Sequence, residues 1–186
     1  MDSYIDLRLK PDPEFPATTL MNALFSKLHR GLATYGRGDI GISFPDAADK
    51  RSLGCRLRLH GNATALHQLV QIDWLQGMRD HVASTGIMAV PAAAKPRRVR
   101  RVQAKSSPER LRRRLVARKG LDQESARQRI PDEVAEILEL PYVVLSSATT
   151  GQRFRLFIEQ MPIQSESING SFNAYGLSAS ATVPWF

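Results

Sequence analysis

Two hydrophobic patterns follow one another along the first part of the chain, one with the period of a strand and one with the period of a helix. Ile5, Leu7 and Leu9 alternate with polar side chains, which predicts a half-buried strand over residues 4–9. From residue 18 to 34, leucine recurs at every fourth position from Leu20 onward, which predicts an amphipathic helix.

The same two patterns continue to about residue 90. They predict a short strand at 40–44, a third strand at 56–60, a helix from 66 to about 81 and a fourth strand at 87–90. The predicted order is β-α-β-β-α-β, the ferredoxin-like arrangement of an antiparallel four-stranded sheet with two helices on one face. Because this fold hosts many unrelated functions, the order alone decides none of them.

A proline-bracketed stretch at 91–96 is typical of a linker, so we expect a domain boundary there. Beyond it the sequence predicts helices at 108–119 and 131–140, a pair of strands at 142–147 and 152–161, and strand-like residues at 172–177. The chain is therefore predicted to be an α+β protein. Its ferredoxin-like domain covers residues 1–94, and a smaller α+β domain with an arginine-rich helix covers 95–186.

Positive charge is concentrated in one segment. The whole chain carries 26 Lys and Arg against 18 Asp and Glu, a formal net charge of +8. Residues 95–119 hold twelve of these cations and one acid, Glu109, which makes the segment +11 and leaves +8 − 11 = −3 for the other residues. Clustered positive charge forms a binding surface for a polyanion.

The predicted helix at 108–119 has a narrow apolar side. On a helical wheel Leu111 and Leu115 share that side, whereas arginines occupy most of the remaining circumference. The arginines on the wheel are Arg110, Arg112, Arg113 and Arg114, with Lys119 near Arg112. A solvated charged helix is the alternative, but uncompensated repulsion disfavours it. We predict nucleic-acid binding, and the helix alone does not choose between RNA and DNA.

Several chemistries are disfavoured by what the sequence contains. Cys55 is the only cysteine, so an intramolecular disulfide is excluded. The four histidines (His29, His60, His67 and His81) lack metal-ligand spacing, and nucleotide-binding fingerprints are missing, so we expect neither a metal nor a cofactor. Without a secretory leader pattern or a stretch long enough to span a membrane, a cytoplasmic protein is expected. His29 remains a candidate for acid-base work on a phosphate, although most histidines serve other roles.

Six stretches, in order along nearly the whole chain, carry a family resemblance. They are MDSYIDLRLKPDPEFP with the helix LFSKLH ending on His29, IGISFP at 40–45, RVQAKSSPERLRRRL at 101–115, TTGQRFRLFI at 149–158, AYGLS at 174–178 and VPWF at 183–186. On these motifs the chain resembles the repeat-processing endoribonucleases of type I-F CRISPR systems, which cut precursor CRISPR RNA.

The resemblance implies a mode of RNA binding and a reaction. The arginine-rich helix would enter the major groove at the base of a repeat stem-loop, and the RNA would be cut at the 3′ side of the stem. The nucleophile would be the RNA's own 2′-hydroxyl, without a metal, giving a 2′,3′-cyclic phosphate and a 5′-hydroxyl. The protein would stay bound to its product and join other subunits of a type I-F CRISPR surveillance complex.

Matching motifs assign roles to individual residues. His29 matches the catalytic histidine, Ser147 the serine that holds the 2′-hydroxyl, and Tyr175 the tyrosine that orients the histidine. Arg101 and Gln103 match the pair that reads base edges, as expected of such side chains in a groove. Phe154 matches the aromatic that stacks on the terminal base pair of the stem. The helix residues Arg114 and Arg118 match phosphate contacts, and Arg110, Arg113 and Thr150 complete the predicted RNA-binding set.

Some positions depart from the family pattern. Ala117 stands where another arginine is expected, Lys119 where a histidine is common, and Ala148 and Thr149 change the turn after Ser147. These differences put the number of phosphate contacts and the stem preference in question. Two rival hypotheses remain from the sequence: a non-catalytic protein that binds an RNA hairpin, and a DNA-binding accessory protein.

Overall fold

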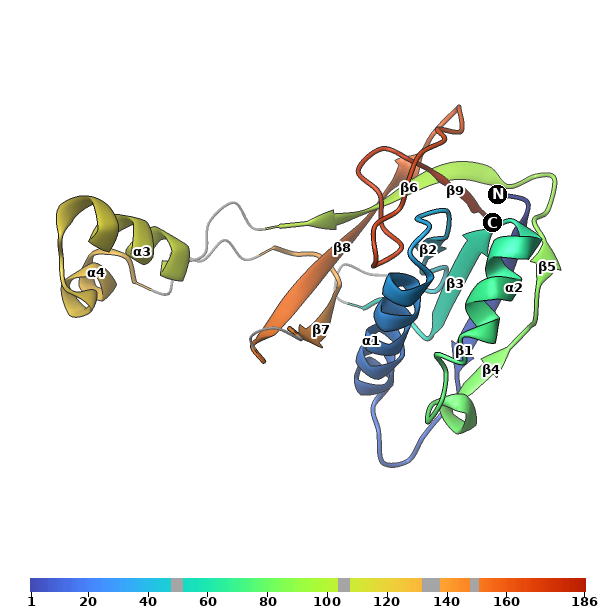
Figure 1. Ribbon diagram of the computed structural model, residues 1–186, viewed down its shortest axis with the longest axis horizontal. Helices are drawn as coiled ribbons and strands as arrows, with labels where there is room; N and C mark the ends of the chain where they lie inside the picture. Colours follow the sequence, from blue (N-terminus) through green and yellow to red (C-terminus); the bar gives the residue numbers. More distant parts are fainter. Residues whose placement is uncertain (48–51, 104–107, 132–137, 148–150) are drawn as a thin grey trace. The chain divides into compact units, whose positions relative to one another are not determined.

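The computed structural model describes residues 1–47, 52–103, 108–131, 138–147 and 151–186. It contains two antiparallel sheets together with helices, so the predicted α+β class is confirmed (Figure 1). The chain forms two compact units. Residues 1–102 and 140–186 form the larger unit, and residues 103–139 form the smaller one.

The first sheet is built from the N-terminal half of the chain. Its strands are β1 (Ser3–Leu9), β2 (Gly41–Ser43), β3 (Arg56–Gly61), β4 (Val82–Ser84) and β5 (Met88–Ala89). Hydrogen bonding gives the order β2-β3-β1-β4, with β5 paired to β1, and every one of these pairs is antiparallel. Helix α1 (Ala17–Tyr35) follows β1, and helix α2 (Ala63–Gln71) follows β3, as the hydrophobic patterns predict.

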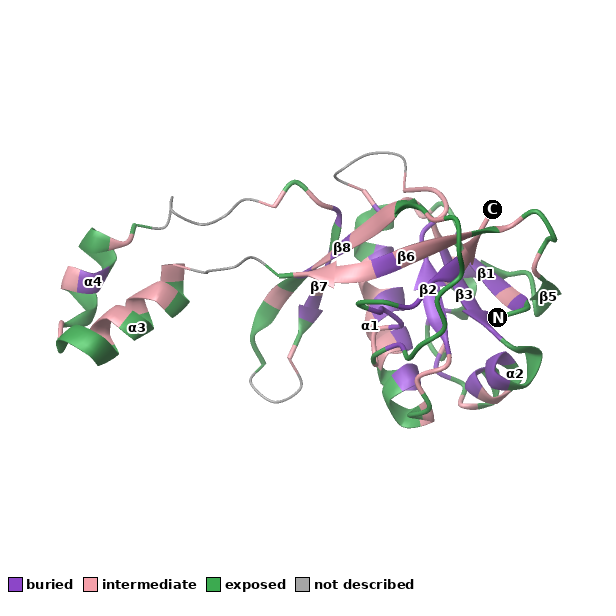
Figure 2. Ribbon diagram, turned by 90° about the horizontal axis from the view of Figure 1, so that it is seen from above, coloured by how far each residue is buried: buried purple, intermediate pink, exposed green. Residues whose placement is uncertain are grey.

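Helix α1 buries the side that its leucine spacing marks. Leu24, Phe25 and Leu28 are fully buried, while the positions of the helix outside this buried side are half-buried or exposed, as the colouring of Figure 2 shows. The helix ends at Gly36, whose φ of 71° is the left-handed conformation that closes many helices. This geometry places the last two turns of α1, including His29, against the C-terminal part of the chain.

The predicted helix from 66 to about 81 is wrong in its second half. Helix α2 ends at Gln71, and the following residues form turns in which Asp73 and Gly77 have φ values of 54° and 73°. A short 3-10 helix, η1 (Arg79–His81), precedes β4. Trp74 and Met78 are nevertheless buried. The spacing of these residues therefore predicted their burial correctly, but they reach the core from turns and not from a helix.

The second sheet uses only residues beyond the predicted boundary. Its strands are β6 (Lys95–Val102), β7 (Tyr142–Ser146), β8 (Arg153–Ile163) and β9 (Val183–Trp185), in the order β7-β8-β6-β9. The predicted pair of strands at 142–147 and 152–161 is confirmed. The predicted linker is shorter than expected, because Lys95 and Pro96 already pair with β9. The predicted boundary at residue 94 falls between the strands of the first sheet and those of the second. The division into two domains stays a prediction.

The strand-like segment at 172–177 is a loop, so that prediction is wrong. Phe172 and Leu177 are buried although the segment does not pair as a strand, which explains its apolar composition. Phe172 and Val183, from the C-terminal part of the chain, pack tightly against Gly41 of β2. A Cβ atom added to Gly41 would stand 2.6 Å from Val183 and 2.7 Å from Phe172, so only glycine permits this approach.

The smaller unit contains helix α3 (Pro108–Lys119), as predicted, and helix α4 (Gln123–Arg129), which was not predicted. Ala126 of α4 is buried, and the Nε atom of Arg112 donates to the Ile130 carbonyl at 2.7 Å. The expected helix at 131–140 falls mostly on residues outside those described, and the described residues 138–140 are not helical.

In the described parts of the chain, no helix combines the length and apolarity needed to cross a bilayer.

Candidate active site

His29 lies near the end of α1, next to the buried Leu28, and is itself half-buried. Its Nδ1 atom is 2.8 Å from the backbone carbonyl oxygen of Ala174. A carbonyl oxygen can only accept a hydrogen bond, so in a neutral ring this contact requires the hydrogen to be on Nδ1. The other nitrogen, Nε2, is then left with the lone pair that a general base requires.

The ring of His29 is held flat against Tyr175. Their ring centroids are 4.1 Å apart and the planes differ by 16°. Tyr175 in turn stacks on Phe25 at 6.4 Å, and Phe25 stacks on Phe44 at 6.2 Å. We call these four residues the ring column. Because Phe25 and Phe44 are fully buried, the column fixes the plane of His29 from the core outward.

Arg101 joins the same site from the second sheet. It follows Val99 on β6 by two positions and therefore shares the face on which Val99 is buried. Its guanidinium carbon is 5.9 Å from the ring centroid of Tyr175. Its Nε atom is buried without a hydrogen-bond partner among the described residues. A buried donor of this kind is suited to a ligand that brings an acceptor.

Ser147 directly follows β7. Its backbone N–H donates to the Gln152 carbonyl at 2.9 Å, and its own carbonyl accepts from Gly151 at 2.8 Å. Strand β7 packs on α1, where the Val144 N–H donates to the Asn22 side chain at 2.9 Å. The structure thus brings His29, Tyr175 and Arg101 together and places Ser147 just beyond a strand that packs on the same helix.

The predicted RNA-binding residues occupy different surroundings. Phe154 is half-buried on β8, opposite Leu145, and packs against the core. Gln103 is exposed just after β6. The exposed arginines of α3 are Arg110, Arg113, Arg114 and Arg118. Thr150, with the departures Ala148 and Thr149, lies outside the described residues. The roles assigned to these residues and to the catalytic set stay predictions.

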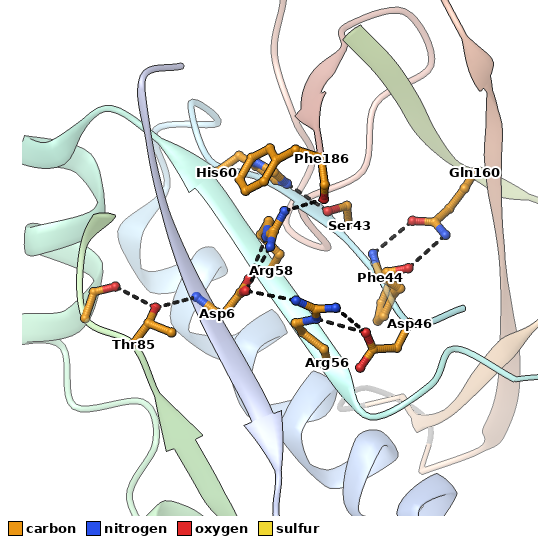
Figure 3. Close-up of polar contacts among 11 residues, drawn as sticks. Asp6, Ser43, Phe44, Asp46, Arg56, Arg58, His60, Thr85, Gln160 and Phe186 are labelled. Carbon is orange, nitrogen blue, oxygen red and sulfur yellow. Dashed lines mark hydrogen bonds and ion pairs between the residues drawn. The ribbon is translucent and has the colours of Figure 1, made fainter. Parts of the chain in front are cut away.

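The other histidines have structural partners or surroundings of their own. His60 is fully buried, with Nε2 at 2.8 Å from the Ser43 hydroxyl (Figure 3). Burial, followed by the positive charge of Arg58, lowers the pKa of His60 to about 3. His81 lies 3.0 Å from a carboxylate oxygen of Asp12. His60 is therefore neutral and enclosed, which leaves it unsuited to proton transfer with a bound substrate.

Sequence reasoning missed two groups that shape the site. One is the backbone carbonyl of Ala174, which has no residue-type pattern because every residue carries a carbonyl. The other is Gln160 on β8, whose side-chain amide binds the backbone of Phe44 at the base of the ring column. An amide that bonds to backbone across two sheets leaves no spacing in the sequence that would reveal it.

Comparison with known proteins finds similar sequences along the whole chain. The family model described as CRISPR-associated protein (Cas_Csy4) matches residues 4–186. The chain is 53% identical to "CRISPR-associated endonuclease Cas6/Csy4" of Pseudomonas aeruginosa (strain UCBPP-PA14), with all of both chains covered. It is 44% identical to a protein of the same description from Escherichia coli (strain UTI89 / UPEC), again with all of both chains covered.

Proposed function

The chain belongs to the Cas_Csy4 family of CRISPR-associated proteins, and on this basis we propose that it is an endoribonuclease that processes the repeats of precursor CRISPR RNA. The observation that carries the proposal is the hydrogen bond between His29 and Ala174, in a chain that matches the family model over residues 4–186. It leaves one histidine nitrogen ready to take a proton in a half-buried site.

The proposed reaction uses the RNA's own 2′-hydroxyl and no metal. Nε2 of His29 accepts the 2′-hydroxyl proton as the 2′-oxygen attacks the adjacent phosphorus and the bond from phosphorus to the 5′-oxygen breaks. The leaving 5′-oxygen takes up a proton, so the products are a 2′,3′-cyclic phosphate and a 5′-hydroxyl. Tyr175 holds the imidazole plane, and Ser147 holds the ribose hydroxyl. Proton transfer by a positioned side chain typically contributes ~10²–10⁴ in rate.

The proposed grip on RNA combines three kinds of contact. The exposed arginines of α3 would meet phosphates in the major groove of the stem, which favours tight and salt-dependent binding. Arg101 and Gln103 would read base edges low in the stem, and Phe154 would stack on its last base pair. With these contacts retained after the cut, the protein would hold its product and present it to the other subunits of a type I-F complex in the cytoplasm.

One experiment separates this proposal from its rivals. The protein is incubated in chelator with a repeat RNA hairpin, with a copy carrying one 2′-deoxy nucleotide at the cut, and with the equivalent DNA. We expect cleavage of the first RNA alone and tight binding of both RNAs. Binding without cleavage would indicate a non-catalytic RNA-hairpin-binding protein, and preference for the DNA would indicate a DNA-binding accessory protein.

The assignment of His29 is tested by substitution. We expect His29→Ala to reduce cleavage by ~10²–10⁴ while hairpin affinity stays within a few-fold, because the imidazole acts mainly in the transition state. His67→Ala is the matched control, since His67 is exposed on α2. Cleavage at nearly the unmodified rate by His29→Ala would remove this residue from the mechanism.

A further inference from the structure

The segment that carries Ala174 and Tyr175 is closed into a loop by Asn173. The Asn173 N–H donates to the Leu177 carbonyl at 3.0 Å, and the Asn173 carbonyl accepts from Gly176 at 2.8 Å. In addition, the side-chain oxygen Oδ1 of Asn173 accepts from the N–H of Tyr175 at 2.9 Å and from that of Leu177 at 3.2 Å. One side-chain oxygen therefore holds two backbone amides inside the loop.

The loop is attached to the strands of both sheets. The Gly176 carbonyl accepts from the Ile42 N–H on β2 at 3.0 Å, and the Ser178 N–H donates to the Val99 carbonyl on β6 at 3.1 Å. Gly176 has a φ of 71°, and a Cβ atom there would stand 2.6 Å from Ile42. These contacts fix the far end of the loop. At its near end the Phe172 N–H donates to the Gly38 carbonyl at 2.8 Å, and the next residue, Asn173, holds the amide between Ala174 and Tyr175.

We propose that Asn173 is a positioning residue for His29. Through the two amides that it holds, its side-chain oxygen places both the Ala174 carbonyl and the Tyr175 ring against the imidazole, which selects Nδ1 as the protonated nitrogen and Nε2 as the reacting one. This inference rests on the proposed function, because it concerns the histidine that is proposed to transfer the proton.

The two restraints on His29 depend on adjacent residues of the same loop. The carbonyl of Ala174 fixes which nitrogen holds the hydrogen, and the ring of Tyr175 fixes the plane of the imidazole. Loss of the Asn173 oxygen frees the Tyr175 N–H, which directly follows that carbonyl in the chain. A displacement of about 1 Å at such a group lowers a reaction rate by up to about 10²-fold.

The test compares two substitutions at Asn173 in the full-length protein. Asn173→Ala removes the acceptor, whereas Asn173→Asp keeps an oxygen in the same place. The exposed Asn169 provides the control Asn169→Ala. Single-turnover cleavage is measured at saturating protein, affinity is measured with 2′-deoxy hairpin RNA, and long-range ¹H–¹⁵N NMR reports which nitrogen of His29 carries the hydrogen.

We expect Asn173→Ala to slow cleavage by about 10- to 100-fold with unchanged affinity, and to shift His29 toward a mixture of the two tautomers. Asn173→Asp should cleave within about threefold of the unmodified protein, because its carboxylate accepts the same two bonds. An unchanged rate in Asn173→Ala would overturn the proposal. So would an unchanged His29 tautomer in that variant, or an Asn173→Asp variant as slow as the alanine one.

Failure of this inference is distinguishable from failure of the proposed function. If only Asn173 is misassigned, Asn173→Ala cleaves normally while His29→Ala remains inactive. If the proposed active site is wrong, His29→Ala itself cleaves normally. The NMR measurement needs no activity at all, so it reports on the tautomer in either case.

Discussion

The side-chain amide of Gln160 makes two hydrogen bonds to the backbone of Phe44. Oε1 accepts from the Phe44 N–H at 2.9 Å, and Nε2 donates to the Phe44 carbonyl at 3.1 Å (Figure 3). Gln160 belongs to β8 in the second sheet, and Phe44 directly follows β2 in the first. The amide thus connects the two sheets at the innermost ring of the ring column.

Replacing this amide should destabilise the fold. In Gln160→Leu the N–H of the buried Phe44 loses its partner, whereas the Phe44 carbonyl keeps the bond from the Ala47 N–H at 3.1 Å. A buried donor left without a partner costs about 1–3 kcal/mol. We expect a clear decrease in the free energy of unfolding, measured by urea denaturation. Gln71→Leu at the exposed end of α2 is the control and should change stability by less than about 0.5 kcal/mol. Equal stability of the two variants would contradict the expected role.

Substitution of Tyr175 should separate its ring from its hydroxyl. Tyr175→Phe keeps the stack on His29, so we expect only a few-fold loss of cleavage rate. Tyr175→Ala removes the stack, so the plane of the imidazole is no longer held. We expect the cleavage rate to fall by about 10- to 100-fold. Both rates are measured in single-turnover reactions. If Tyr175→Phe proved as slow as Tyr175→Ala, the hydroxyl rather than the ring would carry the role.

The exposed arginines of α3 should govern the salt dependence of RNA binding. Each cation that meets a phosphate contributes about −0.9 to the slope of log affinity against log salt for a duplex. Arg114→Ala combined with Arg118→Ala should therefore flatten the slope by roughly two units for stems of any sequence. A double variant at the exposed Arg8 and Lys10 matches the charge change and should leave the slope unaltered. An undiminished slope in the α3 variant would rule out its proposed grip on phosphates.

Gln103 should act on sequence preference and not on salt dependence. Gln103→Ala is expected to cost about 1–3 kcal/mol for the hairpin with the preferred base pair at the position that Gln103 reads. Hairpins with another pair there should be bound nearly as before, with the same salt slope. Affinities for a panel of single base-pair variants provide the measurement. A uniform loss across the panel would assign Gln103 to the RNA backbone instead.

Acid should destabilise the protein through His60. Its pKa in the folded state, about 3, lies below the ordinary value of 6.5, so the unfolded chain binds the proton more tightly. The stabilising contribution is complete above about pH 6.5 and is lost progressively toward pH 3, by up to ~1.4 kcal/mol per pH unit. We expect His60→Gln to flatten the fall of unfolding free energy between pH 6 and 4. Parallel curves for the two proteins would exclude His60 as the cause.

The period of the hydrophobic residues predicted the helices and strands that bury one continuous face. Helix α1 and the strands β7 and β8 were placed within a few residues because one continuous face of each is buried. The pattern failed where irregular backbone buries apolar side chains. Trp74, Met78 and Phe172 enter the core from turns and loops, which a period of 3.6 or 2 does not distinguish from a helix or a strand.

The candidate site was less accessible to sequence reasoning. His29 and Tyr175 were named together only through the family resemblance, and the carbonyl that binds His29 lies 145 positions away in the chain. Contacts of such separation depend on how the two sheets pack, which local patterns do not encode. Backbone acceptors such as Ala174, and the side chain of Asn173 that holds their loop, become visible only in three dimensions.

The tight fit of the C-terminal segment on β2 has a consequence for the timing of synthesis. The ribosome makes His29 before Ala174, which follows it by 145 positions, and before Tyr175. Until those residues leave the exit tunnel, Phe25 lacks its outer ring neighbour, and the imidazole lacks both its stacking partner and its carbonyl acceptor. A nascent chain therefore carries the histidine without the surroundings that orient it until Ala174 and Tyr175 have been added.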